Sequence, residues 1–217
     1  AELRADRDVV LVAVAQAGAA LQHASDDLRA DKGVVLVAIR QNAAAFAFAD
    51  AVLRADREVV MAAVSVQSNM LRHASEELRG DSEIVRIAAL RDAMALEYAT
   101  EAARNDRDVM LDVVQKHGHA LRFASLALQY DWELVLTAIE CDAGAMKHAP
   151  HDLRTNIHFV CKAVLANSCS LQYAGEEFRA NETVFADTIG QQIRACQSAN
   201  YPLFADTQNT CSVVCAN

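Results

Sequence analysis

The fold is decided by the stretch Leu28-Arg29-Ala30-Asp31-Lys32-Gly33-Val34-Val35-Leu36, which returns along the chain every 25 residues. Its counterparts begin at Leu3, Leu53, Leu78, Ala103, Leu128, Leu153 and Phe178, and the spacing never slips. A fixed period of this size without insertions is typical of a stacked repeat protein, in which each unit buries its apolar face against its neighbours. We call two positions equivalent when their numbers differ by a multiple of 25.

A helix is expected after the acidic residue of each stretch. An aspartate precedes the apolar run in six repeats, at Asp6, Asp31, Asp56, Asp81, Asp106 and Asp131. Such a residue accepts hydrogen bonds from the first backbone N–H groups of a helix, and a first-turn acid such as Asp8 is also favourable there. The apolar residues that follow recur at the three-and-four spacing of one helix face, as in Val10, Ala13, Val14 and Ala17. The pattern predicts one helix of about ten residues per repeat.

A shorter helical piece follows, Ala20-Leu21-Gln22-His23-Ala24, and its last position is alanine in all eight repeats. We interpret that alanine as a contact where no larger side chain fits. A cap-like residue such as Ser25 then opens one more turn, which ends at the next Leu-Arg pair. The prediction is an all-α protein, an α-solenoid of about eight helical repeats in one continuous array over residues 1–195. Residues 196–217 are expected to form a cysteine-containing C-terminal cap.

Two half-motifs of the repeat match a known family. They are Asp-Arg-Glu-Val-Val-x-x-Ala-Val, from Asp56 to Val64, and Leu-x-x-Ala-Ser-Glu-Glu-Leu-Arg, from Leu71 to Arg79. With them the chain resembles, over residues 1 to about 195, the tandem repeats known as domain of unknown function 4116. The resemblance implies a helical repeat fold, and it implies no catalytic residues.

Composition and motifs argue against several functional classes. The chain holds 29 Asp and Glu against 20 Lys and Arg, a net charge of -9. Nucleic-acid binding depends on clustered Lys and Arg, so no nucleic-acid partner is expected. No apolar run reaches the roughly 18 to 20 residues of a membrane-spanning helix. No Gly-rich phosphate loop, nucleophile elbow or metalloprotease helix is present, so we expect neither an enzyme nor a cofactor.

The histidines and the repeated arginines each allow two interpretations. His23, His73 and His148 stand at positions that are aromatic in other repeats, at Phe48, Tyr98, Phe123 and Tyr173. We interpret these histidines as packing residues and expect no metal. The alternative is a zinc site near Cys141, although the spacings match no known ligand pattern; its histidines would come from His117, His119, His148 and His151. The arginines that recur with the period are interpreted as bridges between repeats, with an anion-binding stripe as the alternative.

All six cysteines lie in the last third of the chain. Cys161 and Cys196 take positions that are leucine in other repeats, so both suit a buried site. Cys211 and Cys215 lie in the tail, and a candidate disulfide with Cys196 would clip that tail over the last repeat. Such a bond would indicate an oxidising compartment or an organelle lumen. The compartment is otherwise unknown from the sequence.

The numbering begins inside a repeat, because Ala1-Glu2-Leu3-Arg4 matches Glu76-Glu77-Leu78-Arg79. We therefore expect that upstream sequence precedes residue 1. As a separate hypothesis, the first repeat presents an open face, through which two copies could associate.

A partner surface is predicted on the long helices. The position opposite the predicted core face is apolar in the first four repeats and polar in the next four, and Leu90 extends the apolar part. We call it the apolar stripe: Val12, Val37, Ala62, Ile87 and Leu90. Its alternative is that the stripe belongs partly to the core. Leu126, Tyr130 and Trp132 form a second candidate cluster, for which core packing is the alternative.

The repeats favour a non-catalytic interaction or scaffold module that binds other proteins, as an accessory subunit of a larger assembly. A self-associating structural protein is the second hypothesis. A metal-binding or enzymatic protein that uses the C-terminal His and Cys residues is a distant third.

Overall fold

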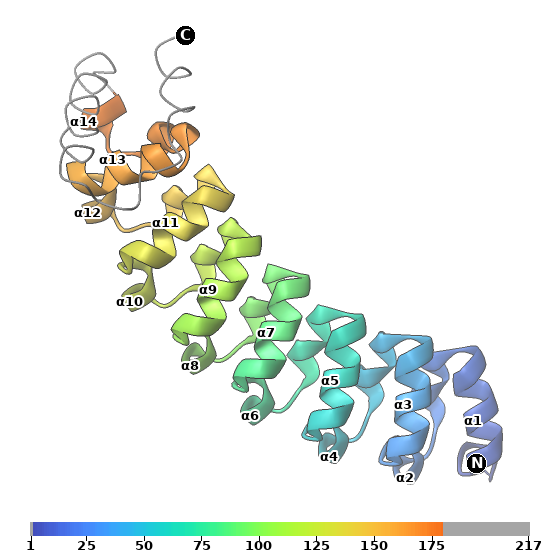
Figure 1. Cartoon of the computed structure of the whole chain (residues 1–217). Coiled ribbons are helices and arrows are strands. Elements are labelled where there is room, and N and C mark those ends of the chain that lie inside the picture. Colours follow the sequence, from blue (N-terminus) through green and yellow to red (C-terminus); the bar gives the residue numbers. More distant parts are fainter. Residues whose placement is uncertain (1, 180–217) are drawn as a thin grey trace. The chain divides into compact units, whose positions relative to one another are not determined.

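The computed structural model describes residues 2–179, and every regular element within them is helical. The chain divides into two units, Ala1–Val113 and Val114–Asn217. Figure 1 shows the helices along the described part of the chain. The all-α repeat fold is confirmed over the described residues. The continuous array over 1–195 stays a prediction, and the cap at 196–217 lies outside the described residues.

Each repeat contains three helical elements, which follow one another in a fixed order. The ten-residue helices are α1 (Arg7–Gln16), α3 (Lys32–Gln41), α5 (Arg57–Val66), α7 (Ser82–Arg91), α9 (Arg107–Lys116), α11 (Trp132–Cys141) and α13 (Ile157–Ala166). The six-residue 3₁₀ helices are η2 (Gly18–His23), η3 (Ala43–Phe48), η4 (Ser68–His73), η5 (Ala93–Tyr98), η6 (Gly118–Phe123), η7 (Ala143–His148) and η8 (Ser168–Tyr173). The four-residue helices are α2 (Asp26–Arg29), α4 (Ala51–Arg54), α6 (Glu76–Arg79), α8 (Glu101–Arg104), α10 (Leu126–Gln129), α12 (His151–Arg154) and α14 (Glu176–Arg179). A short 3₁₀ helix, η1 (Glu2–Arg4), precedes them.

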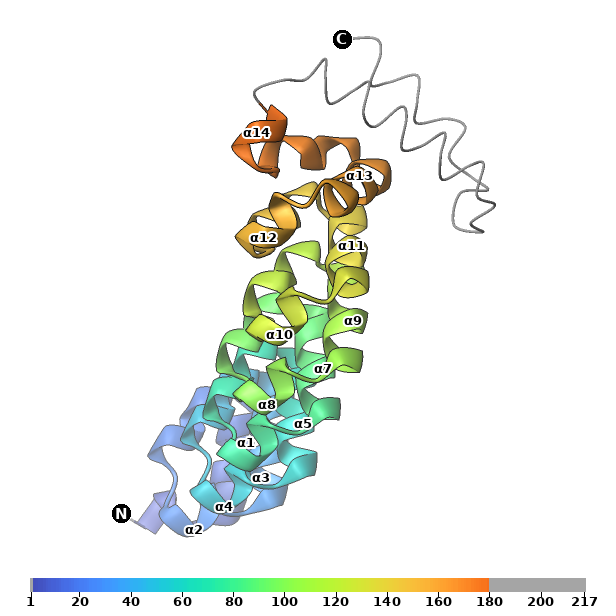
Figure 2. The ribbon, with the colours of Figure 1, turned by 90° about the vertical axis from the view of Figure 1, so that its left-hand side faces the viewer.

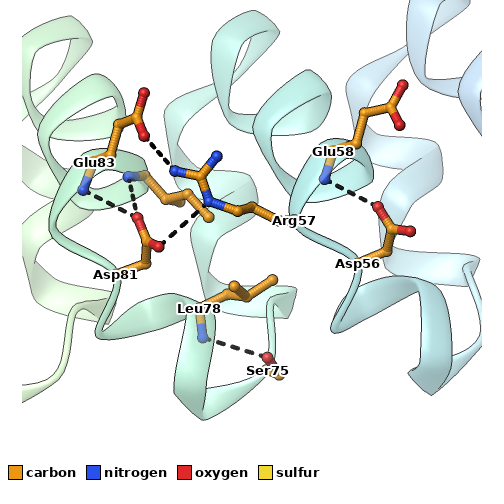
Figure 3. A network of polar contacts seen from close by, with 8 residues as sticks. Asp56, Arg57, Glu58, Ser75, Leu78, Asp81 and Glu83 are labelled. Atoms are coloured by element: carbon orange, nitrogen blue, oxygen red, sulfur yellow. Dashed lines mark hydrogen bonds and ion pairs between the residues drawn. The ribbon is translucent and has the colours of Figure 1, made fainter.

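The ten-residue helices begin where the sequence predicts. Asp56 has an extended backbone, and its Oδ1 accepts a hydrogen bond of 2.9 Å from the backbone N–H of Glu58 (Figure 3). The same oxygen accepts a second one, of 3.1 Å, from the N–H of Val59. These bonds satisfy donors that have no partner inside the helix. Asn156 plays the same part for α13, accepting from the N–H of Phe159 at 3.1 Å.

The core runs along two adjacent rows of each long helix. In α5 the exposed fraction of Val59, Val60, Ala63 and Val64 is 0%. Helix α5 packs against the long helices α3 and α7 and against the 3₁₀ helices η3 and η4, so both rows are covered. The sequence pattern predicted the positions of Val60, Ala63 and Val64 but not that of Val59. It was also wrong about Ala17, which ends α1 as its C-cap and is exposed.

The shorter helical piece is a 3₁₀ helix, and Ala43 and Phe46, one turn apart, have exposed fractions of 2% and 0%. A helix with three residues per turn places these two on one side. Ala45 is also buried, with an exposed fraction of 1%. Ala49 lies just past η3 in an extended conformation, which separates η3 from α4. The repeated alanine is buried at six positions, Ala49, Ala74, Ala99, Ala124, Ala149 and Ala174, and half-buried at Ala24. That no larger side chain fits there stays a prediction.

A backbone hydrogen bond joins the end of several short helices to the following repeat. The N–H of Asp50 donates to the carbonyl oxygen of Arg29 at 3.0 Å. Equivalent bonds join Ser25 to Arg4, Ser75 to Arg54, Thr100 to Arg79 and Gly175 to Arg154. The repeated arginines therefore connect repeats through their carbonyl groups. In unit 2 the four-residue helices α10, α12 and α14 lie on one side, and the ten-residue helices α11 and α13 lie on the other (Figure 2).

Candidate functional site

A row of ionic contacts links the long helices of unit 1. The first residue of a helix contacts the N-cap aspartate of the next one, with Lys32 Nζ 2.9 Å from Asp56 Oδ2. Arg57 Nε lies 3.5 Å from Asp81 Oδ2 (Figure 3). At α7 the contact is a hydrogen bond, which the Ser82 hydroxyl donates to Asp106 Oδ2 at 2.6 Å. The Lys32 ammonium group holds the pKa of Asp56 below its usual range. These aspartates both cap a helix and bind the neighbouring repeat, so the row is part of the stacking. It is not a free anionic site.

The apolar stripe is unequally exposed. Val12 is 61% exposed, whereas Val37, Ala62, Ile87 and Leu90 are half-buried. Val12 lies on α1, which has no long helix before it within the described residues. On the same helix Val9 is 43% exposed, although its counterparts Val34, Val59 and Ile84 are 0% exposed. The open side of α1 is thus an apolar surface of the kind that a neighbouring repeat covers elsewhere.

The three residues of the second predicted cluster, Leu126, Tyr130 and Trp132, differ in their exposure. Leu126 is 73% exposed and Tyr130 45% exposed, both at α10. The Tyr130 hydroxyl lies 3.4 Å from Asp152 Oδ2. Trp132 is half-buried, and its ring meets the edge of Phe159 at a centroid distance of 5.4 Å. Leu126 and Tyr130 therefore form the accessible part, while Trp132 contributes to packing.

The four-residue helices differ in the character of their first two positions. In α6 and α14 both positions are glutamate, at Glu76, Glu77, Glu176 and Glu177. In α10 and α4 a large apolar residue replaces one of them, Leu126 and Val52, and each is 73% exposed. Large apolar side chains at such exposure mark candidate contact points for a partner.

The 3₁₀ helices carry basic side chains and almost no carboxylates. Among the seven six-residue helices η2 to η8 the only carboxylate is Glu97. Their basic residues are Arg72, Arg122 and Lys147, with His23, His73, His119 and His148. Sequence reasoning treated these histidines one by one and missed the segregation of charge. The sequence could have shown this segregation, because the segment of each repeat that forms the 3₁₀ helix contains almost no Asp or Glu.

Two half-buried histidines of this row have pKa values below the ordinary value. Arg72 Nε donates a hydrogen bond of 2.9 Å to His73 Nε2, which requires a neutral imidazole. Burial lowers the pKa of His73, and the charges of Arg72 and Arg54 lower it further. Burial likewise lowers the pKa of His148, followed by the charges of Arg122 and Lys147. Each histidine thus lies where cations gather.

The arginine side chains of the four-residue helices do not form the predicted bridges throughout. Arg29 pairs with Asp26 of its own helix, and Arg79 Nη1 lies 3.5 Å from the carbonyl oxygen of Tyr98 in the next repeat. The buried Nε atoms of five of these arginines have no hydrogen-bond partner: Arg29, Arg54, Arg79, Arg104 and Arg154. Neighbouring repeats are therefore joined mainly through the backbone carbonyl groups of these arginines and not through their side chains.

Neither a metal centre nor a membrane span is found in the part of the chain that the structure describes. No three His, Cys, Asp or Glu side chains are arranged there to hold a metal ion. The rings of His117 and His119 lie edge to face, with centroids 6.0 Å apart. No described helix is long and apolar enough to cross a bilayer. Cys161 is buried and Cys141 is exposed, whereas the candidate disulfide residues Cys196, Cys211 and Cys215 lie outside the described residues.

Comparison with known proteins agrees with the repeat organisation. The model of the family described as domain of unknown function DUF4116 matches four tandem segments, residues 6–54, 56–102, 81–129 and 131–179. The chain belongs to this family. Each DUF4116 match spans about two of the 25-residue repeats, so the family unit is a pair of them. No curated protein matches the chain, and no solved structure does.

Proposed function

We propose that this DUF4116 chain is a non-catalytic protein-interaction module that serves as a scaffold subunit of a larger assembly. The observation that carries the proposal is the exposure of Leu126 and Tyr130 at the surface of α10. Large apolar and aromatic side chains at the surface are the usual anchors of protein–protein contacts. A helical repeat array suits this role because its stacked units present an extended surface.

The first experiment is to isolate the tagged protein from its native source under gentle conditions and to identify the chains that co-purify by mass spectrometry. Fixed companions in a large assembly are expected. A protein that migrates alone, at the mass of a single chain, would contradict the proposal.

A matched pair of variants then locates the contact. Leu126→Glu introduces the residue found at the equivalent positions Glu76 and Glu176, so the helix accepts it. Ala102→Glu, at the exposed second position of α8, is the control, because Glu77 is its counterpart and no large apolar side chain is lost there. We expect Leu126→Glu to lose the companions and Ala102→Glu to keep them. Companions that survive Leu126→Glu would place the contact elsewhere on the surface.

Self-association through the first repeat is a second candidate, and Val9 and Val12 of α1 are the exposed apolar residues that it would use. The matched variant is Val12→Asp, because the equivalent residue Asp112 is tolerated in α9. Light scattering over a range of protein concentrations tests it. A dimer that disappears in Val12→Asp would favour self-association, and a concentration-independent monomer would reject it.

A further inference from the structure

Three departures from the repeated residues gather at helix α10. At the position of Leu126 no other repeat has a large apolar residue, and at the position of Tyr130 no other repeat has an aromatic one. Gln129 replaces an arginine that every other repeat keeps. Residues that the stacking needs recur with the period, so departures that coincide at one helix indicate a local function.

The replacement of the arginine by Gln129 removes a positive charge from α10. Its Nε2 donates hydrogen bonds to the carbonyl oxygens of Ala124 at 3.2 Å and of Leu121 at 3.4 Å, so the side chain keeps a structural role without a charge. The sequence of α10 is Leu-Ala-Leu-Gln, which contains no charged residue. A cation of a partner protein therefore meets no like charge on this helix.

Tyr130 lies beside a carboxylate of the next repeat. Its hydroxyl donates a hydrogen bond of 3.4 Å to Asp152 Oδ2 on α12. Among the described residues, no Lys or Arg forms an ion pair with Asp152. Asp152 is exposed, and the exposed fraction of Tyr130 is 45%. An aromatic ring and an unpaired carboxylate are thus both accessible at one junction between repeats.

Leu126 adds an apolar contact on the same helix. Tyr130 is the C-cap of α10 and keeps a helical backbone, with φ -91° and ψ -7°. Residues four apart on a helical backbone lie on the same face. The side chain of Leu126, which is 73% exposed, therefore lies on the face that carries Tyr130. We call Leu126, Tyr130 and Asp152 the α10 surface.

A ring beside a carboxylate is a combination that binds an arginine side chain. The planar guanidinium group stacks on an aromatic face, and its N–H groups form two parallel hydrogen bonds to a carboxylate. A lysine ammonium group is a compact and more strongly hydrated charge, so the same site favours arginine over lysine.

We propose that the α10 surface binds a segment of a partner protein in which an arginine stands next to a large apolar residue. The arginine would stack on Tyr130 and pair with Asp152, and the apolar residue would contact Leu126. The proposal rests on the interaction function proposed above and adds the chemistry of the partner. The charge of Asp152 supplies the complementarity, because it attracts a cationic segment and repels an acidic one.

This combination occurs at one junction among the described repeats. Glu77 and Glu177 are equivalent to Asp152, but the residues at the position of Tyr130 in the repeats before them are Ala55 and Thr155. These junctions have the carboxylate without the ring. They provide controls that share the local backbone and the charge.

The test measures binding of a fluorescent peptide of three Leu-Arg pairs to the full chain by anisotropy. Matched peptides replace every arginine by lysine or by citrulline, which keeps the shape of arginine without its charge. We expect the arginine peptide to bind more tightly than the lysine peptide, and about tenfold or more tightly than the citrulline peptide. The lysine peptide controls for attraction to the acidic chain as a whole, whose net charge is -9.

Two single variants remove one half of the site each. Asp152→Asn and Tyr130→Ala should each weaken binding of the arginine peptide about tenfold. Uncharged or small residues at the equivalent positions Ala102 and Ala55 indicate that the fold tolerates both changes, and circular dichroism checks it. The matched control is Glu177→Gln on α14, which should bind the peptide as the wild type does.

Three results would overturn the proposal. The first is a wild type that binds the arginine and citrulline peptides equally. The second is a Glu177→Gln variant that loses as much affinity as Asp152→Asn. The third is a dimer of the chain that dissociates in Asp152→Asn, because the α10 surface would then bind a second copy and not a partner protein.

The two proposals fail separately. If companions co-purify and persist in Asp152→Asn while the arginine peptide does not bind, the arginine proposal falls and the scaffold function stands. If no companion co-purifies, the scaffold function itself is rejected.

Discussion

The backbone N–H of Ser75 donates a hydrogen bond of 2.9 Å to the carbonyl oxygen of Arg54 in the preceding repeat. Among the described residues the same bond recurs at four other junctions. In unit 2 the equivalent of Ser75 is Pro150, which has no N–H to donate and faces Gln129 in place of an arginine. The chain therefore accepts proline at this position, at the cost of one link between repeats.

Replacing Ser75 by proline is expected to destabilise unit 1. The φ of Ser75 is -58°, which proline accepts, so the backbone conformation can stay the same. Leaving the Arg54 carbonyl without its donor costs about 1 to 3 kcal/mol, more than the roughly 0.4 to 1 kcal/mol that proline gains through the unfolded state. Ser75→Ala, which removes only the side-chain cap on Leu78 N–H, is the control. Urea unfolding should place Ser75→Pro below Ser75→Ala, and equal stabilities would contradict the role of the bond.

Asp56 combines two functions that two substitutions separate. Asp56→Asn keeps the side-chain oxygen that caps α5 but loses the ion pair with Lys32. Asp56→Ala loses both. The cap is worth about 1 kcal/mol, whereas an exposed ion pair is worth roughly 0.2 to 1 kcal/mol. Thermal unfolding should therefore show a clearly larger loss for alanine, and the aspartate would not be a significant cap if the two variants melted alike.

Gly118→Ala is expected to destabilise unit 2. A Cβ at this position would lie 2.4 Å from the carbonyl oxygen of Ala138 and 2.9 Å from the backbone nitrogen of Asp142. Backbone atoms cannot move aside cheaply, so the overpacking should cost about 1 to 3 kcal/mol. Gly144→Ala is the control, because its Cβ would meet only side-chain atoms of Asp142, the nearest at 3.1 Å. Equal losses of stability in the two variants would argue against the close approach.

The stability of unit 1 should decrease on acidification through the titration of His73. The pKa of His73 is lowered in the folded state by burial and by Arg72 and Arg54. The unfolded chain therefore binds a proton first, and stability falls as the pH drops through the ordinary value of 6.5 toward the folded pKa. His73→Phe, which introduces the residue found at Phe48, should remove this contribution. Urea unfolding of both proteins at about pH 7.5 and pH 5.5 compares them, and parallel losses would show that His73 does not contribute.

The repeat and its helix starts were determined by the sequence alone. The Leu-Arg-x-Asp stretch at Leu28 predicted the period, and Asp56 predicted the start of a ten-residue helix. Both depend on local chemistry, because a cap acts on backbone groups two or three residues away. The exposed Leu126 was also visible as an apolar residue where other repeats have glutamate.

Other features depended on contacts between repeats. Positions equivalent to Gly118 include Ala43, so periodicity alone suggests that alanine fits, yet the approach of Ala138 leaves no room for it. The stacking of the helices also decides three other features. It buries a second row of core residues, and it leaves Trp132 half-buried but Tyr130 exposed. It also brings the charges of Arg122 and Lys147 near His148. Local propensity specifies which helices form, but burial and electrostatic fields depend on distances between residues about 25 apart in sequence. Those distances are decided by the tertiary structure.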